Sequence, residues 1–173
     1  MLTEGQIHYL SKVPDDQKMV VKPFNPKGLE IANQIIAEIK AVEPDLEVLC
    51  VGSVPLKIAG QEDIDINAFC VKAEQDKHFP NFKKLYGEPS RIGKASIGWD
   101  FQRNGYSVDV WLTDPTAETT KQQIKVLNIL KDNPELLKEY EQIKLSAKNL
   151  PYKQYQTKKY EFYNRILGLD ENE

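Results

Sequence analysis

Asn104 and Gly105 separate two strand-like runs in the segment SIGWDFQRNGYSVDVWLTD. An Asn-Gly pair between such runs predicts a β-hairpin with a two-residue turn, because both residue types accept the positive φ angles that this turn requires. The two strands of a hairpin are antiparallel and adjacent in a sheet. Part of this chain is therefore expected to be a β-sheet, and an all-helical fold is excluded.

Two more strands and several helices are expected around this hairpin. Strands are predicted over Glu47–Ser53 and Asp63–Val71. The segment FNPKGLEIANQIIAEIKAVEPD predicts a helix that Asn25 caps and Pro44 ends, with apolar residues at helical spacing. A short helix is expected to stop near Gly87. Further helices are expected over roughly 117–131, 134–148 and 153–167, since Pro134 and Pro151 are typical of helix starts. Residues 1–23 show no clear period and receive no element.

The expected fold class is α+β, with a small mixed β-sheet, covering helices and a C-terminal helical tail. The chain has 173 residues, which predicts one domain over 1–173, with a core at about 27–115 and tail helices at about 116–168. No apolar run approaches the roughly 18 residues of a membrane span, and a cytoplasmic protein without membrane partners is expected. Cys50 and Cys70 are predicted to be buried free thiols. His8 and His78 are expected to have no site role, for lack of a metal-ligand partner at useful spacing.

Two aspartates lie at alternate positions of the predicted strand DIDINAF. Side chains alternate between the faces of a strand, so Asp63 and Asp65 are expected on one face and Ile64 on the other. Asp109 interrupts the apolar run YSVDVWL of the predicted hairpin. If the two strands are neighbours, the three carboxylates converge, and oxygen ligands on a rigid element suit Mg²⁺. A solvated strand face is the alternative explanation for the same pattern.

Gly52 and Ser53 end the strand before this pair. A glycine lets backbone N–H groups approach a phosphate closely, and the serine hydroxyl supplies one more donor. The combination of Gly-Ser, a connector and Asp-Ile-Asp therefore indicates a phosphate cradle beside half of a metal site. A simple turn is the alternative for the Gly-Ser pair alone.

The pattern Gly-Ser, about ten residues, Asp, apolar, Asp, and a later strand Asp resembles the signature of the nucleotidyltransferase superfamily that includes DNA polymerase beta. Within it, the connector VGSVPLKIAGQEDIDI and the ending LNILKDNPELLKEYEQIKLSAKNLPYKQYQTKKYEFYNRIL are similar to the GrpB family. The resemblance covers roughly residues 27–168. The connector is shorter than that of the family by two residues, and Leu127 stands where an arginine is expected.

The resemblance implies a metal-dependent nucleotidyltransferase, which transfers a nucleoside monophosphate from an NTP to an acceptor. It implies Asp63, Asp65 and Asp109 as catalytic residues and ligands of Mg²⁺ or Mn²⁺. Gly52 and Ser53 would contact the nucleotide, and superfamily relatives often use a lysine of the tail, here Lys159, to meet the triphosphate. The acceptor is a small molecule, a protein or an RNA end.

Other interpretations of the sequence stay open. The same fold could be a nucleotide-binding or regulatory pseudoenzyme, or a nucleic-acid-binding module, since tyrosines and lysines alternate in the last predicted helix. Helix packing explains that alternation equally. Lys57, Arg91, Lys94 and Arg103 could meet an anionic acceptor, and Trp99 is expected in the core.

Overall fold

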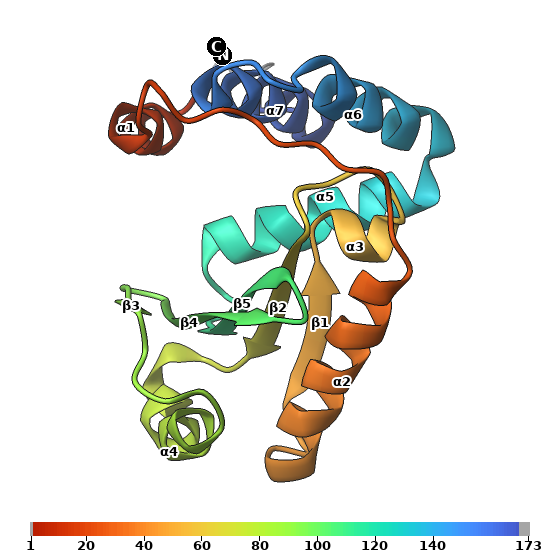
Figure 1. The fold of residues 1–173 in the computed structure, drawn as a ribbon. Coiled ribbons are helices and arrows are strands. Elements are labelled where there is room, and N and C mark those ends of the chain that lie inside the picture. The colour runs from red at the N-terminus through yellow and green to blue at the C-terminus, as the bar shows by residue number, and fades with distance from the viewer. Residues whose placement is uncertain (1, 170–173) are drawn as a thin grey trace. The chain divides into compact units, whose positions relative to one another are not determined.

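The computed structural model describes residues 2–169 and divides the chain into two compact units. The sheet unit contains Asn25–Lys57 and Glu62–Ile124, and the helical unit contains Ile58–Gln61 with the described parts of Met1–Phe24 and Lys125–Glu173. Figure 1 shows the elements of both units. That the whole chain forms one domain stays a prediction.

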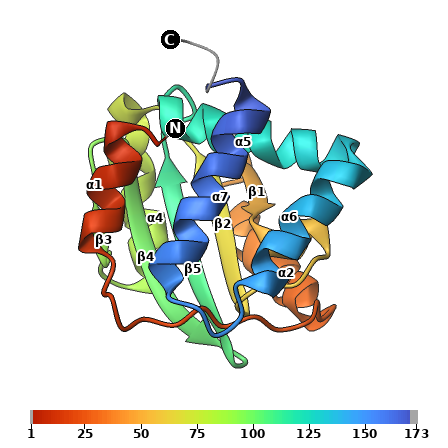
Figure 2. The same cartoon turned by 90° about the horizontal axis from the view of Figure 1, so that it is seen from above.

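The sheet unit is built on a mixed five-stranded sheet, so the predicted α+β class is confirmed. The strands are β1 (Glu47–Val51), β2 (Asp63–Phe69), β3 (Arg91–Ile92), β4 (Ser96–Arg103) and β5 (Tyr106–Thr113). Their order is β1-β2-β5-β4-β3, with only the β2–β5 pair parallel. Figure 2 shows β1, β2, β5 and β4 side by side in this order.

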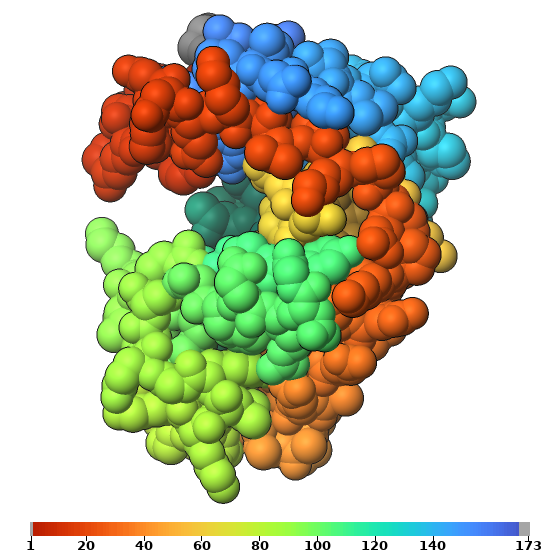
Figure 3. Space-filling view, viewed as in Figure 1, coloured from red at the N-terminus to blue at the C-terminus, as the bar shows by residue number. Residues whose placement is uncertain are grey.

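The predicted hairpin forms at Asn104 and Gly105, which adopt φ angles of 53° and 86°. The turn joins β4 to β5 with Arg103 opposite Tyr106. Next to the turn, Arg103 donates to Glu38 of α2 (Lys27–Val42) at 2.8 Å. Figure 3 shows the hairpin and α2 next to each other on the surface of this unit.

Helices α2 (Lys27–Val42) and α4 (Gln75–Tyr86) cover one face of the sheet (Figure 1). Their apolar side chains meet those of β2, β4 and β5 in one core cluster, which includes Ile31, Ile35, Ile64, Phe82 and Trp99. Trp99 is 1% exposed, so its predicted core position is confirmed. The indole stacks on Phe82, and the ring centroids lie 5.3 Å apart.

The opposite face of the sheet meets the first half of α5 (Glu118–Asp132). Asn67 of β2 donates to Gln123 at 2.7 Å, and the Thr113 and Thr120 hydroxyls lie 3.3 Å apart. Asn67 and Thr113 lie in the C-terminal halves of β2 and β5, so these contacts connect α5 to that end of the two strands.

The helical unit has its own core beside α1 (Glu4–Lys12), α6 (Pro134–Ser146) and α7 (Tyr152–Leu167). The buried residues of this core cluster are Met19, Val21, Ala59, Ala147 and Tyr155. Helix α1 lies within residues 1–23, for which no element was predicted. The signal was present, since Thr3 and Gln6 form a reciprocal capping box.

Several predicted boundaries are corrected. The strand predicted over Glu47–Ser53 ends at Val51, because Gly52 turns the chain with a φ of 80° and Ser53 begins the short helix α3 (Ser53–Leu56). The strand predicted to Val71 ends at Phe69, and a single 3-10 turn, η1 (Lys72–Glu74), leads into α4. None of the helices in the part of the chain that the structure describes is both long and apolar enough to cross a membrane.

Candidate active site

Asp65 and Asp109 are direct partners in the parallel β2–β5 pair. Partners in adjacent strands point to the same face of the sheet and lie about 4.8 Å apart, so the two carboxylates are neighbours. Asp63, two residues earlier in β2, is on the same face and opposite Ser107. The structure therefore brings the three predicted carboxylates together on the face opposite α2 and α4.

Asp100 adds a fourth carboxylate to this row, because it is the partner of Asp109 in the antiparallel β4–β5 pair. Asp100 is not among the site residues predicted from the sequence. A two-residue turn at Asn104 and Gly105 fixes the register of the hairpin, and counting outward from that turn pairs residue 100 with residue 109. The signal was thus available in the sequence.

Arg91 of the edge strand β3 neutralises part of this charge. Its guanidinium forms ion pairs with Asp109 and, at 3.7 Å, with Asp100. It also lies 4.4 Å from the centroid of the Trp111 indole, which is a cation–π contact. Arg91 therefore has both an apolar support and two acidic partners at the candidate site.

The electrostatic state of Asp109 follows from these contacts. Partial burial raises the pKa of the Asp109 carboxyl, and Asp100 and Asp63 raise it further, while the charge and hydrogen bond of Arg91 lower the pKa. The net direction is upward. A carboxylate in this position gains from a second cation, since a nearby positive charge favours the ionised form.

Gly52 lies against the Asp65 carboxylate. A Cβ atom built on Gly52 would be 3.0 Å from Asp65 Oδ2, and the backbone has a φ of 80° that side chains rarely adopt. Val51 is the β1 partner of Asp65, so the chain passes the carboxylate as it leaves the strand. Only a glycine permits this close approach. The following residue, Ser53, is buried.

These residues suit Mg²⁺ or Mn²⁺ as ligands. Aspartate oxygens on two adjacent strands match the preference of Mg²⁺ for a few carboxylates at short distance. Burial makes the Asp109 charge costly, so a cation bound beside it would favour the ionised form. Asp63, Asp65 and Asp109 would be the protein ligands.

Lys159 lies on α7 in the helical unit, whereas the carboxylates and Gly52–Ser53 lie in the sheet unit. Its ammonium is 5.5 Å from the centroid of the Tyr163 ring. Burial lowers the pKa of Lys159, but the phenol oxygens of Tyr163, Tyr155 and other tyrosines outweigh this and raise it above the ordinary value. The contact of Lys159 with a triphosphate stays a prediction.

A second cluster lies where β2 ends. The potential metal-ligand atoms of Cys70, Glu74 and His78 all lie within 4.8 Å of one another. The expectation that His78 has no metal-ligand partner at useful spacing is therefore wrong. The sequence signal is the repeated interval of three residues between the members. The predicted burial of the Cys70 thiol is confirmed, while Cys50 is only partly buried.

Comparisons with known proteins support the fold. The sequence matches no family model, and no curated protein matches it. Among solved structures, it is similar to the conserved protein GrpB from Enterococcus faecalis, with a TM-score of 0.60 and 15% identity over 88% of this chain and 93% of that one. It also aligns with Cid1, an RNA terminal uridylyl transferase, at a TM-score of 0.47 and 12% identity, over 77% of this chain and 42% of Cid1. The resemblance to GrpB inferred from the sequence is thus confirmed at the level of structure, and this chain has the GrpB fold.

Proposed function

We propose that this chain is a metal-dependent nucleotidyltransferase that transfers a nucleoside monophosphate from an NTP to an acceptor. The observation that carries the proposal is the register of β2 and β5, which pairs Asp65 with Asp109 beside Asp63 and Gly52. In the reaction, an acceptor oxygen forms a bond to the α-phosphorus and loses its proton, and the bond from that phosphorus to pyrophosphate breaks.

The residues have separate roles in this proposal. Asp63 and Asp65 would hold Mg²⁺ or Mn²⁺ at the triphosphate, and Asp109 would hold the ion at the acceptor. When bound, such ions favour deprotonation of the attacking hydroxyl and neutralise the leaving group. The backbone N–H groups at Gly52 and the Ser53 hydroxyl would orient the phosphates, and Lys159 would add a positive charge.

Arg91 has a defined part as well. It neutralises Asp109 and Asp100 in the metal-free chain, so a cation that binds Asp109 competes with this ion pair. Trp111 keeps the guanidinium beside the site after the pair is broken. Arg91 would then be the cation that meets a phosphate or an anionic acceptor, as the sequence analysis allowed.

The nucleic-acid-binding alternative receives less support. Tyr155 of the Lys/Tyr-rich helix is 2% exposed and lies in the core of the helical unit, so it offers no free face to a base. Helix packing therefore explains at least this tyrosine.

Binding and transfer are measured separately in the experiment. Mg²⁺ and NTP are expected to raise the melting temperature of the wild type by mass action, and Asp65→Asn is expected to abolish the increase. Asp109→Ala is expected to bind NTP nearly as well as the wild type but to lose transfer by at least about two orders of magnitude in single-turnover assays with α-labelled NTP. Asp45→Asn, at an exposed position of the α2–β1 loop, is the matched control.

Two results decide against the proposal. A wild type without a thermal shift at millimolar Mg²⁺ and NTP has no nucleotide site, and the proposal fails. A shift that Asp65→Asn abolishes, without label transfer or pyrophosphate release for any acceptor class, identifies the pseudoenzyme instead.

A further inference from the structure

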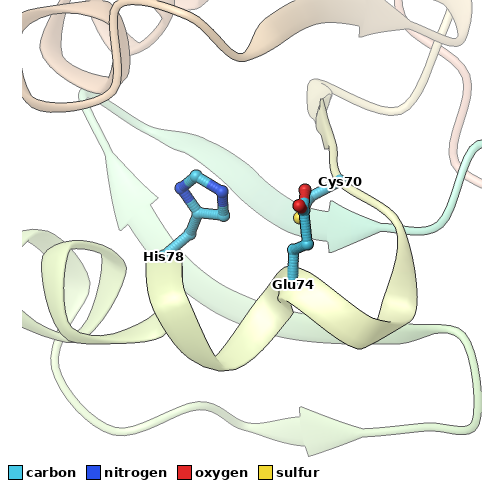
Figure 4. A group of neighbouring side chains, drawn as sticks. All are labelled: Cys70, Glu74 and His78. Carbon is cyan, nitrogen blue, oxygen red and sulfur yellow. The ribbon is translucent and has the colours of Figure 1, made fainter.

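Cys70, Glu74 and His78 lie on the short connection from β2 to α4. Cys70 directly follows the strand, Glu74 ends η1, and His78 is in the first turn of α4. Residues four apart on helical backbone share a face, which explains why Glu74 and His78 are neighbours. Figure 4 shows the three side chains gathered on one side of this connection.

The orientation of His78 is fixed by a partner outside the cluster. Its Nδ1 lies 2.8 Å from Glu43 Oε2, and the other oxygen of Glu43 accepts from Asn81 at 2.8 Å. A carboxylate can only accept, so Nδ1 carries a proton, and in the neutral imidazole Nε2 is the nitrogen with the free lone pair. In Figure 4 one ring nitrogen faces the side on which Cys70 and Glu74 lie. A histidine whose second nitrogen donates to a carboxylate is the usual arrangement of a metal ligand.

We propose that Cys70, Glu74 and His78 bind a zinc ion, and that Glu43 positions the histidine. A thiolate, an imidazole and a carboxylate are the ligand types of Zn²⁺, whereas Mg²⁺ prefers oxygen alone. Zinc bonds of about 2.0–2.3 Å in a tetrahedron place ligand atoms roughly 3.5 Å apart. The three atoms are within 4.8 Å already, and the exposed Glu74 side chain can supply the remaining movement. Water takes the fourth position.

This site is separate from the carboxylate cluster. Cys70 follows the C-terminal end of β2, and Asp65 lies near its start, which is a distance of about 17 Å along an extended chain. The ligand types differ as well, so the two sites select different ions. A zinc ion here would fasten the first turn of α4 to the end of β2, and this role does not depend on nucleotidyl transfer.

Cobalt titration tests the proposal with the full-length chain, after treatment with a chelator and a reductant. Co²⁺ is expected to bind one per chain and to give the near-ultraviolet absorption of a thiolate–cobalt bond. Zn²⁺ is expected to displace it, and Mg²⁺ is not. Cys70→Ser should remove the absorption, and Cys50→Ser, which changes the other cysteine, should keep it.

Two more variants separate the ligands from the positioning residue. Glu74→Gln alters an exposed side chain, so folding is not at risk, and it should weaken Zn²⁺ binding more than Glu43→Gln does. Glu43→Gln should weaken binding by roughly 10–100-fold and leave the thiolate absorption at saturating Co²⁺ intact. Absence of the absorption in the wild type, its persistence in Cys70→Ser, its loss in Cys50→Ser, or unchanged affinity in Glu74→Gln would each overturn the proposal.

Discussion

One methyl group added at Gly98 should disturb the candidate active site through the Trp111 ring. A Cβ atom on Gly98 would lie 2.5, 2.7 and 2.9 Å from three carbons of the Trp111 ring, because the two residues are partners across β4 and β5. Carbon atoms pack best at about 3.5–4.0 Å, so the indole must move by roughly 1 Å. Arg91 lies on that indole and pairs with Asp109.

The expected cost of Gly98→Ala follows from two opposing effects. Overpacking costs about 1–3 kcal/mol, and replacing glycine by alanine in extended backbone returns roughly 0.5–1 kcal/mol. Because all three contacts would be shorter than 3.0 Å, the overpacking cost lies in the upper half of its range, and the net loss is about 1–2.5 kcal/mol. This lowers the melting temperature of a chain of this size by roughly 2–10 °C. Thermal and urea unfolding followed by circular dichroism measure it.

Gly93→Ala is the matched control, because its Cβ would meet the Ser96 carbonyl oxygen at an ordinary 3.5 Å. A second comparison introduces Gly98→Ala into a Trp111→Leu background, where the smaller side chain should remove most of the penalty. If Gly98→Ala is as stable as the wild type, or if the penalty is unchanged beside Leu, the packing argument for this face is refuted.

Three further outcomes are expected. Gly5→Ala in α1 should raise stability by about 0.5 kcal/mol in urea unfolding, because no atom lies within 4 Å of the new methyl group. Tyr140→Phe should lower it by about 1 kcal/mol in the same assay, because the buried Tyr140 oxygen accepts from Tyr163 at 3.0 Å. The Asp114 pKa is lowered, first by the Thr116 hydroxyl, so its contribution is present above the unfolded pKa and is lost as pH falls through the folded value. The difference in melting temperature between Asp114→Asn and the wild type should accordingly shrink between pH 7 and strongly acidic pH.

Local signals in the sequence determined most of the elements of the fold. The Asn104–Gly105 pair specified the hairpin because few residues accept two consecutive positive φ angles. Pro134, with Asn133 as the cap that accepts from the Leu136 amide, marked the start of α6 in the same local way. Such signals depend on neighbours in the chain and can be identified without a tertiary structure.

The element boundaries that were predicted wrongly also have local causes, but their signals in the sequence are weaker. β1 ends at Val51, two residues before the predicted end at Ser53, since the φ of 80° at Gly52 is incompatible with a strand. The Thr3–Gln6 capping box of α1 lies in a segment whose apolar residues show little helical period. The capping box was therefore the main sequence signal for α1, and the hydrophobic pattern alone did not indicate the helix.

For the candidate sites, the sequence supplied the residue types and the tertiary structure decided which of them meet. Alternation along a strand places Asp63 and Asp65 on one face, but only the pairing of β2 with β5 sets Asp109 beside them. The Arg91 ion pair depends on the edge strand β3, and the orientation of His78 depends on Glu43, which is 35 residues away. Contacts between distant segments arise from the packing of whole elements. The sequence around one of these residues therefore does not identify the residue that it will contact.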